Sequence, residues 1–351
     1  MEVDYIIVGQ GIAGTMLSYY LLQQGNTVVV IDKYQPNSAS YTASGIINPI
    51  TGLRFVRTWM IESLMPFAEN AYKTLEKELN IQIFQQTQVI DFHASTQMHL
   101  AFNSRLPEEK EYLSISYQNN QWNSAFNYPF GVGIISPVYL INLQKLLTAW
   151  RKKLQAQSLL LDTFFQLNHL QLFPESIQYK QIKAKAIIFC NGIQAAHLPY
   201  FNKLPFAPNK GEALLLNIPQ LPRQFIYKQG ISLVPWQDHL WWAGSSYEWS
   251  YNNHLPSETF RTKTEQQLQK WLLLPFEIKA HIAAERPATI ERRPFVGLHP
   301  YFPQVGILNG LGTKGCSLAP FFANAFSKHL ITREPLLTEI SIHRFQKILK
   351  P

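Results

Sequence analysis

The feature of this chain that most constrains its fold is a glycine-rich turn close to the first residue. Residues 5–8 form a short, wholly apolar run, which is typical of a parallel strand covered on both faces. The turn at residues 9–14 follows at once, and apolar residues then recur at helical spacing over residues 12–24. Gly25 stands where a helix C-terminal cap is expected, and residues 27–31 resemble a second buried strand. This order of strand, glycine turn, helix and strand predicts a βαβ unit.

Each glycine of this turn has a physical role. Gly9 permits a tight turn, Gly11 lets the backbone approach a pyrophosphate, and Gly14 lets the helix pack on the strand. The N–H groups at the helix start, at Ile12 and Ala13, would face the phosphate charge. The turn therefore predicts a bound dinucleotide.

An acidic residue supports this prediction. Asp32 closes the second strand, where a carboxylate would accept the ribose hydroxyls, and Lys33 follows it. A second glycine turn, at residues 310–315, lies between a strand predicted at 305–309 and a helix predicted at 318–330. No convincing strand with an acidic residue follows it, so we reject a second nucleotide site there. Its helix N-terminus, with Lys314, would instead favour the negative charge that reduction leaves on a flavin.

The remaining elements are predicted from periodicity. Residues 53–135 look irregular apart from a helix near residues 61–79, and a further helix is predicted at 140–155. A buried strand at 184–190 ends on Asn191-Gly192. Strand-like runs separated by proline and glycine then predict a mostly antiparallel sheet. These runs lie at residues 213–216, 231–234 and 240–244.

Several classes of protein are disfavoured by composition. The chain holds no run of eighteen apolar residues and begins without a signal-peptide pattern, so we expect a soluble, cytoplasmic protein without a membrane partner. Cys190 and Cys316 are far apart, and the histidines lack metal-site spacing, so we predict reduced, buried cysteines and no metal.

The charge is uneven along the chain. Residues 1–175 hold 11 Lys+Arg against 13 Asp+Glu, whereas residues 176–351 hold 20 against 10. The basic half would suit a nucleic acid, but it equally suits a cleft for an anionic cofactor and a carboxylate substrate. Six aromatic residues crowd residues 236–251, and we expect them to form sheet core and domain interface.

Several segments together resemble the D-amino-acid oxidase superfamily, which includes glycine oxidase and sarcosine oxidase. Residues 39–46 (ASYTASGI) look like its second FAD-binding loop, and residues 187–192 resemble its strand that ends near the cofactor. Lys210-Gly211-Glu212 resembles its glycine turn into the substrate domain, and residues 285–289 with 294–297 resemble its Arg-Pro segment. The resemblance covers nearly the whole chain and implies FAD as cofactor.

The resemblance implies a fold and a reaction. The expected fold class is α/β, with a discontinuous Rossmann-like FAD-binding domain and a smaller, largely antiparallel substrate domain. The FAD-binding domain is predicted at residues 1–52, 136–204 and 284–351, and the substrate domain at residues 53–135 and 205–283. The expected reaction is oxidation of the C–N bond of a primary or secondary amine, with dioxygen as reoxidant.

The resemblance also implies site residues. Arg286 falls on the family's carboxylate-binding arginine, and Arg54 with Arg57 resembles an arginine pair that sarcosine oxidase places beside the flavin ring. Ser232 stands where glycine oxidase carries a substrate-site tyrosine, which disfavours a simple glycine or D-amino-acid oxidase. Lys314, Arg286 and Arg54 are the predicted catalytic residues. The predicted cofactor-binding residues are Gly9, Gly11, Ile12, Ala13, Gly14, Asp32, Lys33, Ser40, Thr42, Ala43, Ser44, Gly45, Ile46, Phe165, Asn191, Gly192, Gly310, Gly312, Thr313, Lys314, Gly315 and Cys316.

Three substrate readings stay open. Residues 311–320 and 291–294 also resemble the oxidase half of a bifunctional enzyme that matures a thiouridine in tRNA, although the methyltransferase half is absent here. The substrate could therefore be a small carboxylated amine or carboxymethylaminomethyl-uridine in tRNA, which is itself an N-substituted glycine. A third reading is a flavin-binding protein without catalysis.

Overall fold

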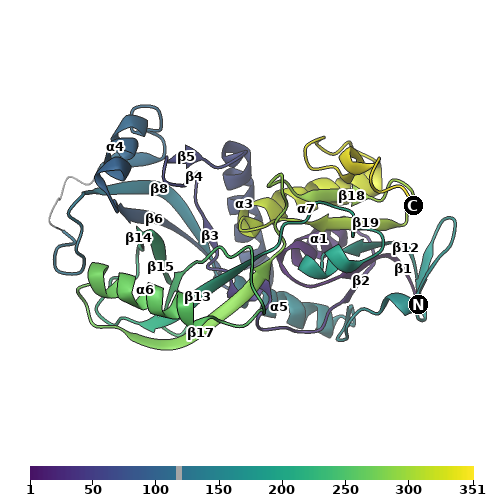
Figure 1. Cartoon of the computed structure of the whole chain (residues 1–351). Coiled ribbons are helices and arrows are strands. Elements are labelled where there is room, and N and C mark those ends of the chain that lie inside the picture. The colour runs from purple at the N-terminus through teal and green to yellow at the C-terminus, as the bar shows by residue number, and fades with distance from the viewer. Residues whose placement is uncertain (116–120) are drawn as a thin grey trace.

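The computed structural model describes residues 1–115 and 121–351, and its strands gather into two large sheets in two lobes (Figure 1). The first sheet has the order β10-β11-β12-β1-β2-β9, with β19 beside β12 and β18 beside β19. Its strands are β1 (Glu2–Val8), β2 (Val28–Ile31), β9 (Leu160–Leu161), β10 (Leu170–Leu172), β11 (Ile177–Tyr179), β12 (Ile182–Phe189), β18 (Phe295–Leu298) and β19 (Val305–Asn309). Its helical elements are α1 (Ile12–Gln23), α5 (Leu143–Ala156), α7 (Gly315–Thr332) and the 3-10 turns η1 (Leu167–His169), η2 (Gly192–His197) and η3 (Ile342–Phe345).

The centre of the first sheet is parallel and apolar. Strand β1 lies between β2 and β12 and runs parallel to both, and β19 runs parallel to β12. Ile6 and Ile7 are both fully buried, because α1 and α7 cover one face of the sheet and loop residues cover the other. The predicted βαβ unit and the predicted α/β fold class are confirmed.

The second sheet is mostly antiparallel, as predicted, with the order β17-β13-β16-β15-β14-β6-β8-β3 and β7 beside β8. Its strands are β3 (Ile46–Ile47), β6 (Phe84–Phe92), β7 (Leu113–Ile115), β8 (Val132–Ile141), β13 (Asn209–Asn217), β14 (Ile226–Gln229), β15 (Ile231–Pro235), β16 (Trp241–Gly244) and β17 (Glu277–Arg286). The other elements are α2 (Ala39–Thr42), α3 (Ile61–Leu79), α4 (Thr96–Arg105), α6 (Glu258–Trp271) and a small hairpin of β4 (Ile50–Thr51) and β5 (Val56–Arg57). The boundaries predicted for two domains stay a prediction.

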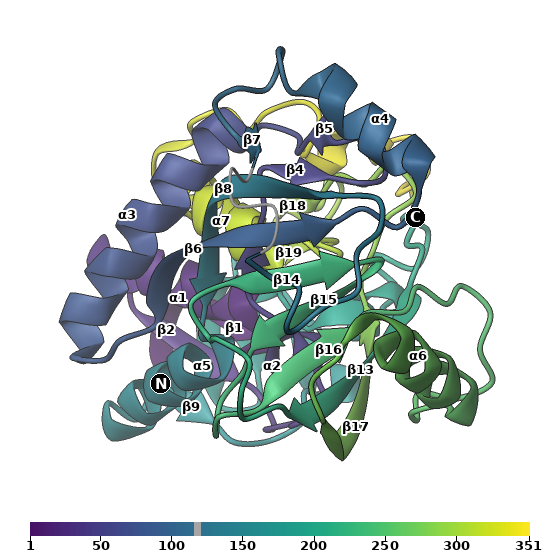
Figure 2. The ribbon, with the colours of Figure 1, turned by 90° about the vertical axis from the view of Figure 1, so that its left-hand side faces the viewer.

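The second sheet has two different faces. Residues on one face, such as Val89, Val234 and Trp242, share a hydrophobic core with α1 and α7, and we call this the inner face. The outer face carries Leu214 and Trp241 and packs on α6. Figure 2 looks onto the sheet with α1 and α7 behind it. The inner face is therefore the side turned toward the glycine turns of the first lobe.

Three element predictions are wrong. Residues 53–135 are not irregular, because β6, β7 and the start of β8 pair there within the second sheet. Strand β6 was missed because its first half contains exposed glutamines and, apart from Phe84, its apolar residues lie in its second half. The helix predicted from Leu140 begins at Leu143, since Leu140 and Ile141 end β8 and the Asn142 side chain accepts a hydrogen bond from the Lys145 N–H at 3.0 Å.

The third error concerns Lys210-Gly211-Glu212, which lies inside β13 and forms no turn. The glycine is needed there for space. A Cβ on Gly211 would lie 1.8 Å from a guanidinium nitrogen of Arg286, so the missing side chain makes room for that arginine.

The predicted aromatic core is confirmed in part. Trp236, Trp241 and Trp242 are buried, but Tyr247 and Trp249 are 59% and 61% exposed. Both cysteines are free and buried, as predicted.

The close packing of the first turn can be tested by adding one methyl group. A Cβ on Gly14 would lie 1.9 Å from the Gly9 carbonyl oxygen, which is backbone and cannot move aside alone. We expect Gly14→Ala to lower the free energy of unfolding by about 3 kcal/mol, as for overpacking in a core. Urea unfolding of the FAD-free protein measures this.

Gly25→Ala is the matched control, because Gly25 has a φ of +78° but nothing within 4 Å of an added Cβ. It should cost only the left-handed backbone penalty of about 1–2 kcal/mol. Equal losses in the two variants would contradict the packing described for the first turn.

Candidate active site

The first glycine turn is held tightly against the end of β12. Gly9 has a φ of +98°, and a Cβ there would lie 2.7 Å from the carbonyl oxygen of Cys190. Because both the left-handed backbone and the contact exclude a side chain, the turn packs closely against the end of β12 just before the start of α1.

The second predicted cofactor loop lies directly over this turn. The Ser40 hydroxyl accepts a hydrogen bond from the Ile12 N–H at 3.0 Å, and a Cβ on Gly11 would lie 2.9 Å from the same oxygen. The Thr42 carbonyl accepts a hydrogen bond from the Trp242 indole at 3.0 Å, which ties the loop to the inner face of the second sheet. Residues 39–45 thus connect the pyrophosphate turn with the other lobe.

The end of the loop is fixed by backbone contacts. Gly45 has a φ of +84°, and a Cβ there would lie 2.0 Å from the Ile141 carbonyl oxygen. Ala43 is extended, Ser44 is partly exposed, and Ile46 pairs with Leu140 in the sheet. The predicted loop residues are therefore brought together at the junction of the two lobes.

Asp32, the carboxylate predicted to bind the ribose, has protein partners in the structure. Asp32 accepts a hydrogen bond from the Gln10 N–H at 2.9 Å. It also forms an ion pair with Arg151 at 2.6 Å. Burial raises the pKa of Asp32, although the hydrogen bonds from Gln10 and Arg151 oppose the rise. Arg151 is itself buried and also contacts Asp162 at 3.1 Å.

Arg151 was not predicted from the sequence, because one arginine on an amphipathic helix gives no signal of a partner 119 residues away. Two further predicted residues have neighbours of their own, and Lys33 shares Asp162 with Arg151. Lys33 pairs with Asp162 at 3.4 Å, and Phe165 stacks on Tyr179 with ring centroids 5.1 Å apart.

Asn191, which follows β12 beside the first glycine turn, has an amide oxygen without a hydrogen-bond partner among the described residues. This oxygen is buried. Next to it, the Gly192 carbonyl accepts a hydrogen bond from the Asn309 amide at 2.8 Å, and the Asn309 oxygen accepts one from the Gly310 N–H. A buried orphan oxygen is costly, so Asn191 is well suited to a ligand with a donor group.

The second glycine turn meets the first. A Cβ on Gly315 would lie 3.1 Å from a methyl carbon of Ile12, so α1 and α7 begin side by side. Gly310 and Gly312 have left-handed backbones, Thr313 is exposed, and Cys316 is buried. Two positive helix ends therefore point to neighbouring positions.

Lys314 is the residue before α7 and is only partly exposed. Its ammonium donates a hydrogen bond to the Thr58 hydroxyl at 3.3 Å. Burial lowers the pKa of Lys314, and the nearby Arg292 and Arg293 lower it further. Thr58 was not predicted, since an isolated threonine carries no sequence signal. The positive group predicted at this helix start is present.

Arg286 ends β17 on the inner face. Its guanidinium donates to the Asn209 side-chain oxygen at 2.9 Å and to the Ser246 carbonyl at 3.0 Å, and it lies 4.8 Å from the centre of the Tyr247 ring. Burial lowers its pKa. No carboxylate within residues 1–115 and 121–351 forms an ion pair with it, so its charge is uncompensated where the structure is described.

Arg286 also lies close to the second glycine turn. The residue after it, Pro287, accepts a hydrogen bond through its carbonyl from the Gly312 N–H at 3.2 Å. The structure therefore brings the predicted carboxylate-binding residue next to the helix end that carries Lys314.

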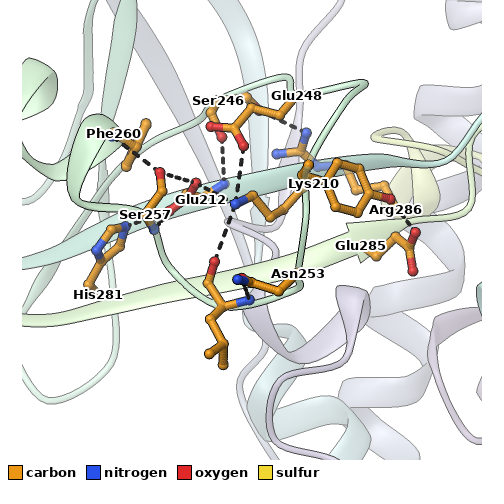
Figure 3. A network of polar contacts seen from close by, with 12 residues as sticks. Lys210, Glu212, Ser246, Glu248, Asn253, Ser257, Phe260, His281, Glu285 and Arg286 are labelled. Atoms are coloured by element: carbon orange, nitrogen blue, oxygen red, sulfur yellow. Dashed lines mark hydrogen bonds and ion pairs between the residues drawn. The ribbon is translucent and has the colours of Figure 1, made fainter.

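A buried polar network on the outer face fixes the segment that leads to Tyr247 (Figure 3). Lys210 contacts Glu212 and Glu248, each at 3.1 Å, and donates to the Leu255 carbonyl. Burial alone would lower the pKa of Lys210, but its hydrogen bonds to Glu248 and Glu212 raise it.

Glu212 completes the network. It accepts hydrogen bonds from the N–H and the hydroxyl of Ser257 and lies 2.9 Å from His281. The network therefore holds both ends of residues 246–257 against β13 and positions the Ser246 carbonyl that Arg286 binds.

No described contact brings the predicted arginine pair, Arg54 and Arg57, next to Arg286 or Lys314. Arg57 pairs with Glu62 and Glu109, each at 2.6 Å, and with Glu111 at 3.7 Å. Arg54 is exposed at the tip of the hairpin. Its catalytic role stays a prediction.

Two adjoining helix N-termini at the carboxyl ends of parallel strands, with a second sheet beside them, are typical of a dinucleotide-binding fold. The comparison with protein families then identifies the chain. Residues 4–328 match the family model described as DAO, FAD dependent oxidoreductase. The chain belongs to this family and is an FAD-dependent oxidoreductase.

Solved structures share the whole fold. Glycine oxidase from Geobacillus kaustophilus superposes with a TM-score of 0.80 at 16% identity, covering 98% of both chains. Iminodiacetate oxidase from Chelativorans sp. BNC1 gives 0.76 at 18% identity, covering 97% of this chain and 98% of the other. The uncharacterized oxidoreductase YurR of Bacillus subtilis (strain 168) is 42% identical over 56 residues, which span 16% of this chain and 15% of that protein.

Two features are absent from the part of the chain that the structure describes. No helix there is long and apolar enough to cross a membrane. No group of three or more His, Cys, Asp or Glu side chains there is arranged to hold a metal ion. The absence of a metal stays a prediction.

The ion pair between Arg151 and Asp32 predicts a measurable effect on FAD binding. We expect Arg151→Met to weaken FAD binding roughly tenfold, because the ribose carboxylate loses its charged hydrogen-bond partner and its orientation. Quenching of FAD fluorescence on titration with apoprotein gives the affinity. Lys152→Met is the control, because Lys152 is exposed on the same helix. Equal affinities of the two variants would refute a role of Arg151 in the FAD site.

Proposed function

We propose that this enzyme oxidises the C–N bond of a primary or secondary amine that carries a carboxylate. The observation that supports the proposal is Arg286, a partly buried guanidinium without a carboxylate partner among the described residues. A planar guanidinium binds a carboxylate through two parallel hydrogen bonds, and an uncompensated buried cation is stabilised by such an anion.

The position of Arg286 supports the same proposal. The Gly312–Pro287 hydrogen bond ties it to the turn before α7, and Lys314 lies at the start of that helix. Bound FAD supplies the acceptor for the hydride that leaves the carbon next to nitrogen. Arg286 would hold the substrate in one orientation, which reduces the entropy that must be lost in the reaction.

The remaining groups act through their positive charge. Lys314 and the N-terminus of α7 would hold positive charge beside a bound flavin, which favours the negative charge that reduction leaves on the ring. If the amine is bound neutral, no protein base is needed, because the nitrogen lone pair forms the imine as the hydride leaves. Water then hydrolyses the imine to a carbonyl compound and an amine, and dioxygen takes up the two electrons to give hydrogen peroxide.

The reaction class is tested by adding candidate amines to the FAD-loaded protein without oxygen. Sarcosine, glycine, D-amino acids, proline analogues and bulk undermethylated tRNA form the panel. We expect a small carboxylated amine to bleach the flavin absorbance, and admission of oxygen to restore it with release of hydrogen peroxide. If only tRNA bleached the flavin, the substrate would be tRNA and not a small amine. Bleaching by none would contradict the proposal and favour a non-catalytic flavoprotein.

The role of Arg286 is tested by a conservative change. Arg286→Lys keeps the charge but loses the bidentate geometry, so we expect the KM for the carboxylated amine to rise roughly thirtyfold, corresponding to about 2 kcal/mol of charged hydrogen bonding. The variant should still bind FAD, as its visible spectrum would show. Arg105→Lys is the control, since the Arg105 side chain on α4 is 39% exposed and pairs with Glu108. An unaltered KM in Arg286→Lys would remove it from the substrate site.

A further inference from the structure

The surroundings of Arg286 come from three backbone segments that pair side by side. Asn209 of β13 is the direct register partner of Arg286 on β17. On the other side of β13, the chain that follows β16 pairs antiparallel with β13 over residues 246–248. Tyr247 therefore stands opposite Gly211, the glycine of β13.

The Arg286 guanidinium reaches across the middle segment. Because side chains alternate along a strand, Asn209, Gly211, Tyr247 and Arg286 belong to the same face of the sheet. A Cβ on Gly211 would lie 1.8 Å from Nη2 of Arg286, and the guanidinium carbon lies 4.8 Å from the centre of the Tyr247 ring. Neither Gly211 nor the neutral Tyr247 ring carries a negative charge that would compensate the guanidinium.

The hydrogen bonds of the guanidinium are unevenly distributed over its nitrogens. A guanidinium has two N–H groups on each Nη and one on Nε. Both described hydrogen bonds of Arg286 leave from Nη1, one to the Asn209 side-chain oxygen at 2.9 Å and one to the Ser246 carbonyl at 3.0 Å. No described residue accepts a hydrogen bond from Nε or Nη2. These two nitrogens form a fork that matches the two oxygens of a carboxylate.

Asn209 combines a hydrogen-bond acceptor with the absence of charge. It is buried, and its amide oxygen must face Arg286 because a guanidinium only donates hydrogen bonds. An aspartate at this position would accept the same hydrogen bond, but it would also form an ion pair with Arg286 and compensate its charge. The neutral amide therefore orients the guanidinium and leaves its charge available to a substrate anion.

We propose that Asn209 is the positioning residue that makes Arg286 selective for a carboxylate, and that the substrate carboxylate binds the fork of Nε and Nη2. This inference rests on the proposed function, which places the substrate carboxylate on Arg286. Asn209 acts through the guanidinium, by orienting it and by adding no charge. An amine whose carboxylate is replaced by an amide has no negative charge for the fork, so selectivity between the two reports on Asn209.

The test compares a carboxylated amine that bleaches the flavin with the amide of the same compound, on the FAD-loaded enzyme. The measured quantity is the ratio of kcat/KM for the acid to kcat/KM for the amide. We expect Asn209→Asp to lower this ratio roughly thirtyfold, because the new carboxylate compensates the charge of Arg286. We expect Asn209→Ala to lower it about fivefold, because the guanidinium loses one orienting hydrogen bond.

Asn217→Asp is the matched control, because it adds the same charge at the opposite end of the same strand, roughly 26 Å away. This variant should keep the ratio of the unaltered enzyme. In Asn209→Asp, kcat/KM for the amide should stay close to that of the unaltered enzyme, since the amide does not depend on the free cation. A merely structural role of Asn209 would instead slow the acid and the amide alike.

The visible spectrum of bound FAD shows whether each variant is folded. An unchanged ratio in folded Asn209→Asp, or equal slowing of the acid and the amide, overturns the inference alone. If Asn209→Asp does not bind FAD, Asn209→Ala decides in its place, and an unchanged ratio there also overturns the inference. If no carboxylated amine bleaches the flavin of the unaltered enzyme, the proposed function fails and this inference fails with it.

Discussion

Helices α1 and α7 begin in contact, and the geometry of the site depends on this packing. Gly315 can approach Ile12 because it has no side chain, and Gly14 lets α1 settle on the turn before it. The two helix ends add their positive potentials at one place, at the carboxyl ends of the parallel strands β1, β12 and β19. A cofactor with a pyrophosphate at one end and an electron-accepting ring at the other matches that arrangement.

The second sheet carries the arginine that is proposed to bind the substrate. Its inner face carries Arg286, whose guanidinium occupies the space left by Gly211. The outer face carries the Lys210–Glu212 network, which satisfies its own charges and holds residues 246–257 in place. The charges of the Lys210–Glu212 network are thus compensated, whereas Arg286 has no carboxylate partner among the described residues. This difference favours a structural role for Lys210 and a binding role for Arg286.

Local patterns in the sequence predicted the parts of the site that local structure determines. The two glycine turns, the buried strands before them and residues 39–46 are continuous segments whose backbone conformation depends on glycine and on apolar periodicity. The structure places them together as expected. Arg286 was found only through resemblance, because its chain neighbours do not show which face of a strand it occupies or which residue leaves room for it.

The parts that were missed depend on contacts between distant residues. Arg151 pairs with Asp32 across 119 residues, and Lys228 pairs with Asp91 across 137. Strand β6 has polar side chains in half of its length and is stabilised by its place between β14 and β8. Single-residue propensities and periodicity do not encode such partners, so strand pairing has to be known before these residues acquire a role.

The central claim is that Arg286 holds the substrate carboxylate beside the flavin. A crystal structure of the FAD-loaded protein with a carboxylated amine analogue that cannot be oxidised tests it most directly. The account predicts two hydrogen bonds between the ligand carboxylate and the Arg286 guanidinium, with the flavin ring next to Lys314. A ligand bound elsewhere, with Arg286 still contacting only Asn209, Ser246 and Tyr247, would contradict it.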